Sequence, residues 1–111
     1  MTLKRHESSK ILSSAVEANG FAFLAGITPK DTSQDIRGQT KQVLAEIDRL
    51  LKVCGTDKSK LVSATIWVTD IRHRDGMNEE WIPWVGNNLP VRACIEAKLA
   101  DPKMLVEIQV T

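Results

Sequence analysis

The chain has 111 residues and a formal net charge of +1 at pH 7, with 42% apolar and 26% charged residues. This length is sufficient for one hydrophobic core and too short for two, so we expect a single domain over residues 1–111. The near-neutral charge gives no broad attraction to nucleic acid or to an anionic membrane. No apolar run reaches the roughly 18 residues of a membrane helix, and the first ten residues lack the apolar segment of a secretion signal. We therefore expect a cytoplasmic protein with no nucleic-acid partner and no membrane span.

The metal-ligating residue types are few and scattered. Cys54 and Cys94 are the two cysteines, and neither lies in a spacing typical of metal ligands. His6 and His73 are far apart in the sequence, and no metal cluster is visible. We expect free thiols in a reducing compartment and no metal.

The first half of the chain predicts two strands and a long helix. Residues 11–16 and 21–26 are β-like runs joined through Asn19-Gly20, which is a strong signal for a tight hairpin. A helix is predicted to follow, with Ser33 or Asp35 as its N-cap and Gly55 at its end. Its apolar residues recur at helical spacing: Ile36, Val43, Leu44, Ile47, Leu50 and Leu51.

The second half predicts three strands and a shorter helix. Residues 61–70 are rich in β-branched side chains, as expected of a central strand. Met77, Trp81, Trp84 and Val85 keep helical spacing, although Pro83 should kink or shorten that helix. Residues 89–99 and 104–110 then form two strands. This order predicts an α+β fold, a mixed β-sheet with both helices packed on one face.

The stretch "LPVRACIEAKL" alternates along residues 89–99. Successive side chains of a strand point to opposite faces, and we expect the apolar set, Ala93, Ile95, Ala97 and Leu99, to face the core. The polar set then belongs to the open face of the sheet: Arg92, Cys94 and Glu96, joined from the last strand by Glu107 and Gln109. Such a face is either ordinary solvated surface or a subunit interface that holds a small polar site.

Several of these segments together resemble the Rid family of reactive-intermediate deaminases, also called the YjgF family. The resemblance covers residues 11–111 and rests on Gln39-Thr40, a strand ending in Asp70, Asn78 ahead of an aromatic, "PVRACIEAKL" and "MLVEIQV". It implies a chorismate-mutase-like fold and a homotrimer whose sheets line a central β-barrel. It also implies three small clefts between subunits, with no cofactor and no metal.

The resemblance assigns roles to individual residues. Arg92 matches the arginine that binds the substrate carboxylate, and Glu107 matches the acid implicated in placing the attacking water. Cys94 matches a cysteine that lines the pocket. Ala25 and Gly26 match a small residue and a glycine that present backbone groups to the substrate.

One family feature is missing. A tyrosine near the first strand is common in the best-known deaminating members, whereas this chain has no tyrosine. The matching position lies near Leu12, beside Ser13, and we include Ser13 among the predicted substrate-binding residues.

The resemblance implies a hydrolase like the 2-iminobutanoate/2-iminopropanoate deaminases. Such an enzyme converts 2-aminoacrylate and 2-imino acids to 2-oxo acids and ammonia. The alternative is a trimer of the same fold that binds a small carboxylate or regulates a partner without turnover. A ribonuclease function, attached to some relatives, has little support from a near-neutral chain with few aromatic residues.

Strand geometry restricts where the predicted site can form. If the last two strands formed a simple hairpin, Arg92 would lie roughly 13 Å from the level of Glu107. The two side chains could not then bind one small ligand. The hypothesis therefore requires that these strands are not adjacent, or that the pocket is assembled across chains.

Overall fold

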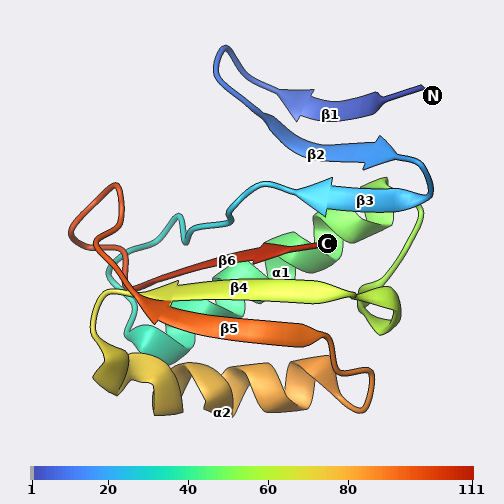
Figure 1. Cartoon of the computed structure of the whole chain (residues 1–111). Helices are drawn as coiled ribbons and strands as arrows, with labels where there is room; N and C mark the ends of the chain where they lie inside the picture. Colours follow the sequence, from blue (N-terminus) through green and yellow to red (C-terminus); the bar gives the residue numbers. More distant parts are fainter. Residues whose placement is uncertain (1) are drawn as a thin grey trace.

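Figure 1 shows the computed structural model of the protein, which describes residues 2–111. Within that range the chain forms strands, two α-helices and two short 3₁₀ helices, η1 and η2. Their order is β1 (Lys4–Ser8), β2 (Ser13–Ala18), β3 (Phe21–Leu24), α1 (Ile36–Val53), η1 (Lys58–Lys60), β4 (Ser63–Val68), η2 (Ile71–His73), α2 (Arg74–Val85), β5 (Val91–Glu96) and β6 (Val106–Val110).

The strands form two three-stranded sheets. β1, β2 and β3 pair antiparallel in that order, whereas β4 lies between a parallel neighbour, β5, and an antiparallel neighbour, β6. Ile27 and Ile108 exchange two backbone hydrogen bonds of 2.8 and 3.0 Å, which bring the chain after β3 beside β6. The strands therefore lie in the order β1, β2, β3, β6, β4, β5 (Figure 1). β5 and β6 are not adjacent, which is one of the two arrangements that would allow Arg92 and Glu107 to share a site.

The two helices pack on the mixed sheet, as predicted. Residues of α1 share one buried cluster with Met77, Trp81 and Val85 of α2 and with the alternate positions of β4 and β6. Those strand positions are Ala64, Ile66, Val68, Val106, Ile108 and Val110. Their burial in alternation is the period-2 pattern of strands with one covered face.

The predicted ends of α1 are confirmed. The Asp35 side chain accepts a hydrogen bond of 2.9 Å from the Gly38 N–H, so Asp35 is the N-cap. Gly55 follows the helix with a φ of +75°, a conformation that favours glycine. α2 continues through Pro83 to Val85, although proline has no N–H to bond the Glu79 carbonyl four residues earlier.

The N-terminal hairpin differs in part from the prediction. The tight turn is confirmed, since Asn19 and Gly20 both have positive φ values, 52° and 83°. The strand before it begins at Ser13 instead of residue 11, and an additional strand, β1, precedes it. β1 has the sequence KRHES and is largely exposed, so it carries no hydrophobic signal.

The predicted faces of β5 are wrong. β5 pairs in parallel with β4, and its polar residues lie level with the buried positions of β4: Arg92 with Ala64, Cys94 with Ile66, and Glu96 with Val68. The polar set therefore faces the helices. Ala93 and Ile95 lie instead on the open face and are exposed. Ala97 and Leu99 follow the end of the strand and are half-buried.

A buried amide explains the Gln39-Thr40 motif. Gln39 Nε2 donates to the carbonyls of Thr32, Gln34 and Lys103, and its Oε1 accepts a 2.7 Å hydrogen bond from the Leu105 N–H. Gln39 is fully buried, so these bonds replace the water that both loop segments would otherwise need. One side chain thus joins α1 to the loop before it and to the segment that leads into β6.

Neither α-helix in residues 2–111 combines the length and the hydropathy that crossing a membrane requires.

Candidate functional site

Arg92 lies on β5, the edge strand, and its side chain extends toward α2. Its Nη1 donates a hydrogen bond of 2.7 Å to Asn78 Oδ1, and the guanidinium carbon lies 5.5 Å from the centre of the Trp81 ring. Asn78 and Trp81 are three residues apart on α2 and so share one helix face. The amide and the indole hold the guanidinium by a hydrogen bond and a cation–π contact.

The charge of Arg92 is not neutralised. Within residues 2–111 no carboxylate forms a salt bridge with this guanidinium. Asn78 accepts from one of its five N–H donors, and the side chain is exposed. The remaining donors can bind a planar anion through two parallel hydrogen bonds, as guanidinium groups bind carboxylates.

The two neighbours of Arg92 on this face differ in role. Cys94 is a free, half-buried thiol that packs against the core beside Ile66. Glu96 accepts a 2.8 Å hydrogen bond from the Ile71 N–H at the start of η2. Glu96 therefore fixes the turn between β4 and α2 and does not pair with Arg92.

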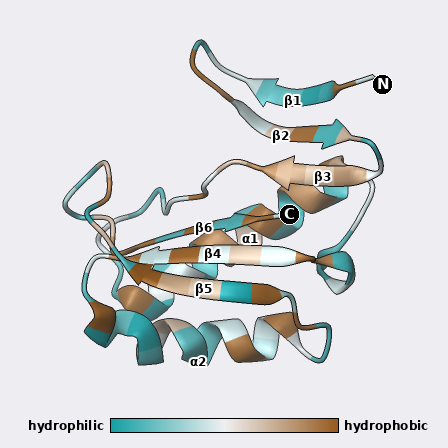
Figure 2. Ribbon diagram, viewed as in Figure 1, coloured by the Kyte–Doolittle hydropathy of each residue, from teal (hydrophilic) through white to brown (hydrophobic). Residues whose placement is uncertain are grey.

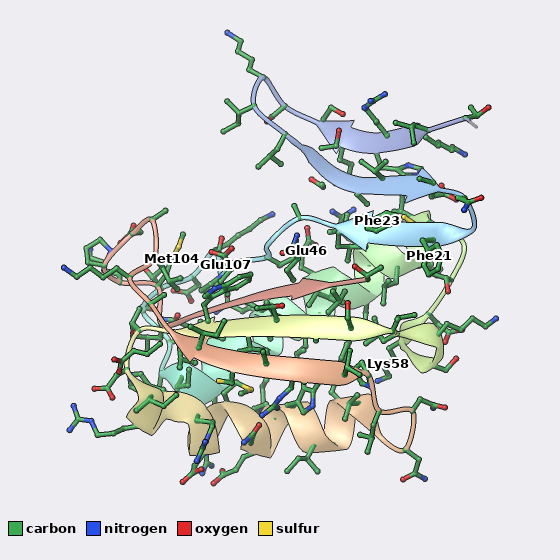
Figure 3. The ribbon with its side chains drawn as sticks, viewed as in Figure 1. Phe21, Phe23, Glu46, Lys58, Met104 and Glu107 are labelled. Carbon is green, nitrogen blue, oxygen red and sulfur yellow. The ribbon has the colours of Figure 1, made fainter. Side chains whose placement is uncertain are left out.

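Glu107 lies on the open face, next to Trp67 of β4 in the strand register. Figure 3 shows Glu107 at the same end of the sheet as Met104, whereas Phe21 and Phe23 lie along β3. Its side chain is half-buried, and burial raises the pKa of the carboxyl above its ordinary value of 4.5. A raised pKa makes the ionised carboxylate a stronger base toward a bound water molecule.

Gly26 lies directly against the Glu107 carboxylate. A Cβ placed on Gly26 would overlap Oε2 of Glu107 and lie 3.0 Å from its Cδ. The φ of Gly26 is outside the left-handed region, so the backbone conformation does not require glycine here. The glycine provides the space that the carboxylate occupies.

The backbone groups around Gly26 are unequally available. The N–H groups of Ala25 and Ile27 donate to the carbonyls of Ser14 and Ile108. Among residues 2–111 no acceptor binds the N–H of Gly26. Gly26, and not Ala25, therefore offers a backbone donor to a ligand.

Ser13 begins β2, and its hydroxyl oxygen lies 2.7 Å from that of Ser8 on β1. This contact occupies the side chain within the N-terminal hairpin.

Arg92 and Glu107 do not meet within one chain. They lie on opposite faces of the mixed sheet, with β4 between their strands. Two strand spacings and three residue steps separate their Cα atoms by about 14 Å. Neither of two surface hollows, of about 490 and 820 Å³, is lined by Arg92, Cys94 or Glu107.

The sequence predicts Arg92 and Glu107 as site residues but does not show how Arg92 is held. The sequence placed Trp81 on a helix by its spacing and gave no sign that the ring contacts the guanidinium. The i, i+3 spacing of Asn78 and Trp81 was visible in the sequence. It carried no information about which strand the helix face would meet.

Known proteins share both the sequence and the fold. The family described as Endoribonuclease L-PSP matches residues 2–111. A RutC family protein from Haemophilus ducreyi is 47% identical over 94 residues, which cover 84% of this chain and 80% of the relative. The crystal structure of a YjgF family member from Neisseria meningitidis has a TM-score of 0.96 at 40% identity, covering 99% of this chain and 92% of that one.

A more distant relative has a functional name. Reactive Intermediate Deaminase A, chloroplastic, from Arabidopsis thaliana is 29% identical over 103 residues, which cover 87% of this chain and 55% of the relative. The family match extends over every described residue, and the bacterial relatives agree in sequence and in structure. The chain therefore belongs to the Rid family, whose members are also called YjgF or RutC family proteins.

Proposed function

We propose that this protein hydrolyses reactive enamines and imines, such as 2-aminoacrylate and 2-imino acids, to 2-oxo acids and ammonia. The observation that carries this proposal is the guanidinium of Arg92, which is held by Asn78 and Trp81 and has no salt bridge within residues 2–111. A small substrate with a carboxylate next to its imine carbon matches this group. The name of the Arabidopsis relative favours the same chemistry.

The site is proposed to form between subunits of a homotrimer. Arg92 extends from the edge strand of one protomer, whereas Gly26 and Glu107 lie on the open face, so a second copy is needed to bring them together. The open face is apolar enough to be an interface, because Phe21, Phe23 and Val91 are 47%, 46% and 72% exposed. In Figure 2, β3 is apolar along its length and hydrophilic colour interrupts β5.

The proposed chemistry needs little beyond positioning. Arg92 binds the carboxylate, which places the electrophilic iminium carbon beside a water held by Glu107. Glu107 takes a proton as the water oxygen attacks the carbon, and it returns that proton to the nitrogen. The C–N bond then breaks and its electron pair leaves with the nitrogen. The hydroxyl group loses its proton to the Glu107 carboxylate as the C=O bond forms, and the products are the 2-oxo acid and ammonia. Cys94 forms part of the pocket wall, and the Gly26 N–H is a donor for the substrate.

Turnover is tested by generating 2-aminoacrylate and 2-iminobutanoate in situ and trapping the remaining imine with semicarbazide. The wild type should suppress semicarbazone formation, and Arg92→Ala and Glu107→Gln should suppress it far less. Arg37→Ala is the control, because it removes an arginine that pairs with Glu79 on the helix surface. Stabilisation of the wild type by a 2-oxo acid without any turnover would favour the non-catalytic, carboxylate-binding alternative.

The subunit arrangement is tested by co-expressing Arg92→Ala with Glu107→Gln. Each variant alone lacks one group at every site. If the two groups come from neighbouring subunits, random mixing restores both to about a quarter of the sites. Activity near that fraction is expected, and the absence of any restored activity in verified mixed oligomers contradicts a site built across subunits.

A further inference from the structure

A second cluster of chemically active side chains lies where the N-terminal hairpin meets the end of α1. It consists of His6 on β1, Glu17 on β2 and Cys54 at the C-cap of α1. One ligand atom from each side chain lies within 4.8 Å of the other two, and all three residues are half-buried. The sequence does not predict this cluster, because its three residues come together only when β1 pairs with β2 and the hairpin packs on α1.

The three ligand atoms lie within reach of a single metal ion. His6 Nε2 and Glu17 Oε2 are 2.6 Å apart, so the imidazole and the carboxylate are hydrogen-bonded when no ion is bound. Ligand atoms around a tetrahedral Zn²⁺ lie roughly 3.3–3.7 Å apart, as follows from bonds of about 2.0–2.3 Å. To reach these distances, the His6–Glu17 pair has to open and the Cys54 sulfur has to lie within the same range of both. The Glu17 side chain is 34% exposed, which leaves room for its carboxylate to move.

The ligand types and charges select the ion. An imidazole, a carboxylate and a thiolate together suit Zn²⁺, whereas Mg²⁺ and Ca²⁺ prefer oxygen ligands only. The carboxylate and the thiolate carry two negative charges, which balance a divalent cation. Lys4 lies opposite Glu17 in the strand register, and its positive charge lowers the pKa of the Cys54 thiol. The Lys4 side chain is exposed and can turn toward solvent when a cation binds.

A metal ion can reach these three side chains from solvent, and a water molecule can be its fourth ligand. Glu17 and Cys54 both line the hollow of about 490 Å³, so an ion can enter from this side and keep one water. In the metal-free protein, burial and the Glu17 carboxylate raise the pKa of the Cys54 thiol. A bound cation reverses this effect, and the thiol proton is released as the metal–sulfur bond forms.

We propose that His6, Glu17 and Cys54 bind one Zn²⁺ ion per chain and thereby fasten β1 and β2 to the C-terminal end of α1. The site is separate from Arg92, Gly26 and Glu107, so its existence does not depend on the deaminase proposal.

The test is a Zn²⁺ titration of the full chain, without an added tag, in competition with a chromophoric chelator and in the presence of a non-thiol reductant. The variants are Cys54→Ser, Glu17→Gln and Cys94→Ser. Cys94→Ser is the matched control, because it removes a second half-buried thiol that lies outside the cluster. Wild type and Cys94→Ser should each bind one equivalent. Cys54→Ser and Glu17→Gln should bind at least about tenfold more weakly.

Two further readouts separate this site from adventitious binding. Co²⁺ in place of Zn²⁺ should give thiolate-to-cobalt charge-transfer absorption in wild type and Cys94→Ser but not in Cys54→Ser. Zn²⁺ should raise the melting temperature of the same two proteins only. Melting of each metal-free variant verifies that it is folded. Equal affinity of wild type and Cys54→Ser, or loss of binding in Cys94→Ser, overturns the proposal.

Discussion

Replacing Gly26 by alanine tests whether the position of the Glu107 carboxylate controls turnover. The new methyl group would overlap Oε2 and lie 3.0 Å from Cδ, so the carboxylate has to move. The move needed to restore van der Waals contact is about 1 Å, and a misplacement of this size costs on the order of 10²-fold in rate. We therefore expect kcat for imine hydrolysis to fall about a hundredfold.

The same substitution should hardly change stability. The atom that the methyl group meets is the end of a flexible side chain, and the φ of Gly26 is accessible to alanine. A glycine-to-alanine change of this kind alters the free energy of unfolding by only about 0.5–1 kcal/mol. Urea denaturation measures the change in the free energy of unfolding, and the semicarbazide-coupled assay measures the rate on the same preparation.

A double variant distinguishes an effect through Glu107 from a general one. If Gly26→Ala acts by displacing the carboxylate, then Gly26→Ala combined with Glu107→Gln should be no slower than Glu107→Gln alone. Wild-type turnover by Gly26→Ala would refute the reasoning. Additive losses in the double variant would also refute it, because they would give Gly26 a role independent of Glu107.

Three further predictions concern Arg92, Glu107 and Gln39. Asn78→Ala should raise KM about 3–10-fold by removing one hydrogen bond to Arg92, and Asn78→Asp should raise it further by neutralising the guanidinium, as steady-state kinetics can measure. The acid limb of kcat/KM against pH should have its midpoint above 4.5, because burial raises the pKa of Glu107. The stability that this group contributes is complete below pH 4.5 and is lost as pH rises through the folded-state pKa. Glu107→Gln should abolish the acid limb in the rate profile and this pH dependence of stability in urea titrations. Gln39→Leu should cost about 3 kcal/mol or more of unfolding free energy in urea denaturation, because the Leu105 N–H and several carbonyls lose their partner; an unchanged denaturation midpoint would show that water replaces these bonds.

The elements that the sequence predicts well are those fixed by local patterns. α1 has apolar residues at helical spacing, an aspartate N-cap and a glycine at its end, and each of these acts within a few residues. The hairpin turn depends on Asn19 and Gly20 alone. β1 was missed because its pairing with β2 is backbone hydrogen bonding between largely exposed strands, which leaves no hydrophobic period to detect.

The candidate sites were predicted less completely, because they depend on contacts between distant segments. Alternation in residues 89–99 separated Arg92 and Cys94 from Ala93 and Ile95 correctly, but it could not say which set the helices cover. That choice follows from the parallel register with β4 and from the Asn78 and Trp81 side chains that receive Arg92. The cluster of His6, Glu17 and Cys54 needs three separate elements and has no spacing signature at all.

The reversed faces of β5 bear on assembly. A strand whose polar side contacts a helix through a guanidinium, and whose apolar side is exposed, is unfavourable in an isolated chain. Val91 and Ile95 gain from burial only if another surface covers the open face, and Phe21 and Phe23 extend that face across β3. A second copy that covers this face and places its edge strand beside Glu107 would both bury these side chains and complete the proposed site. On that proposal, a monomer in solution should expose the apolar face and lack turnover.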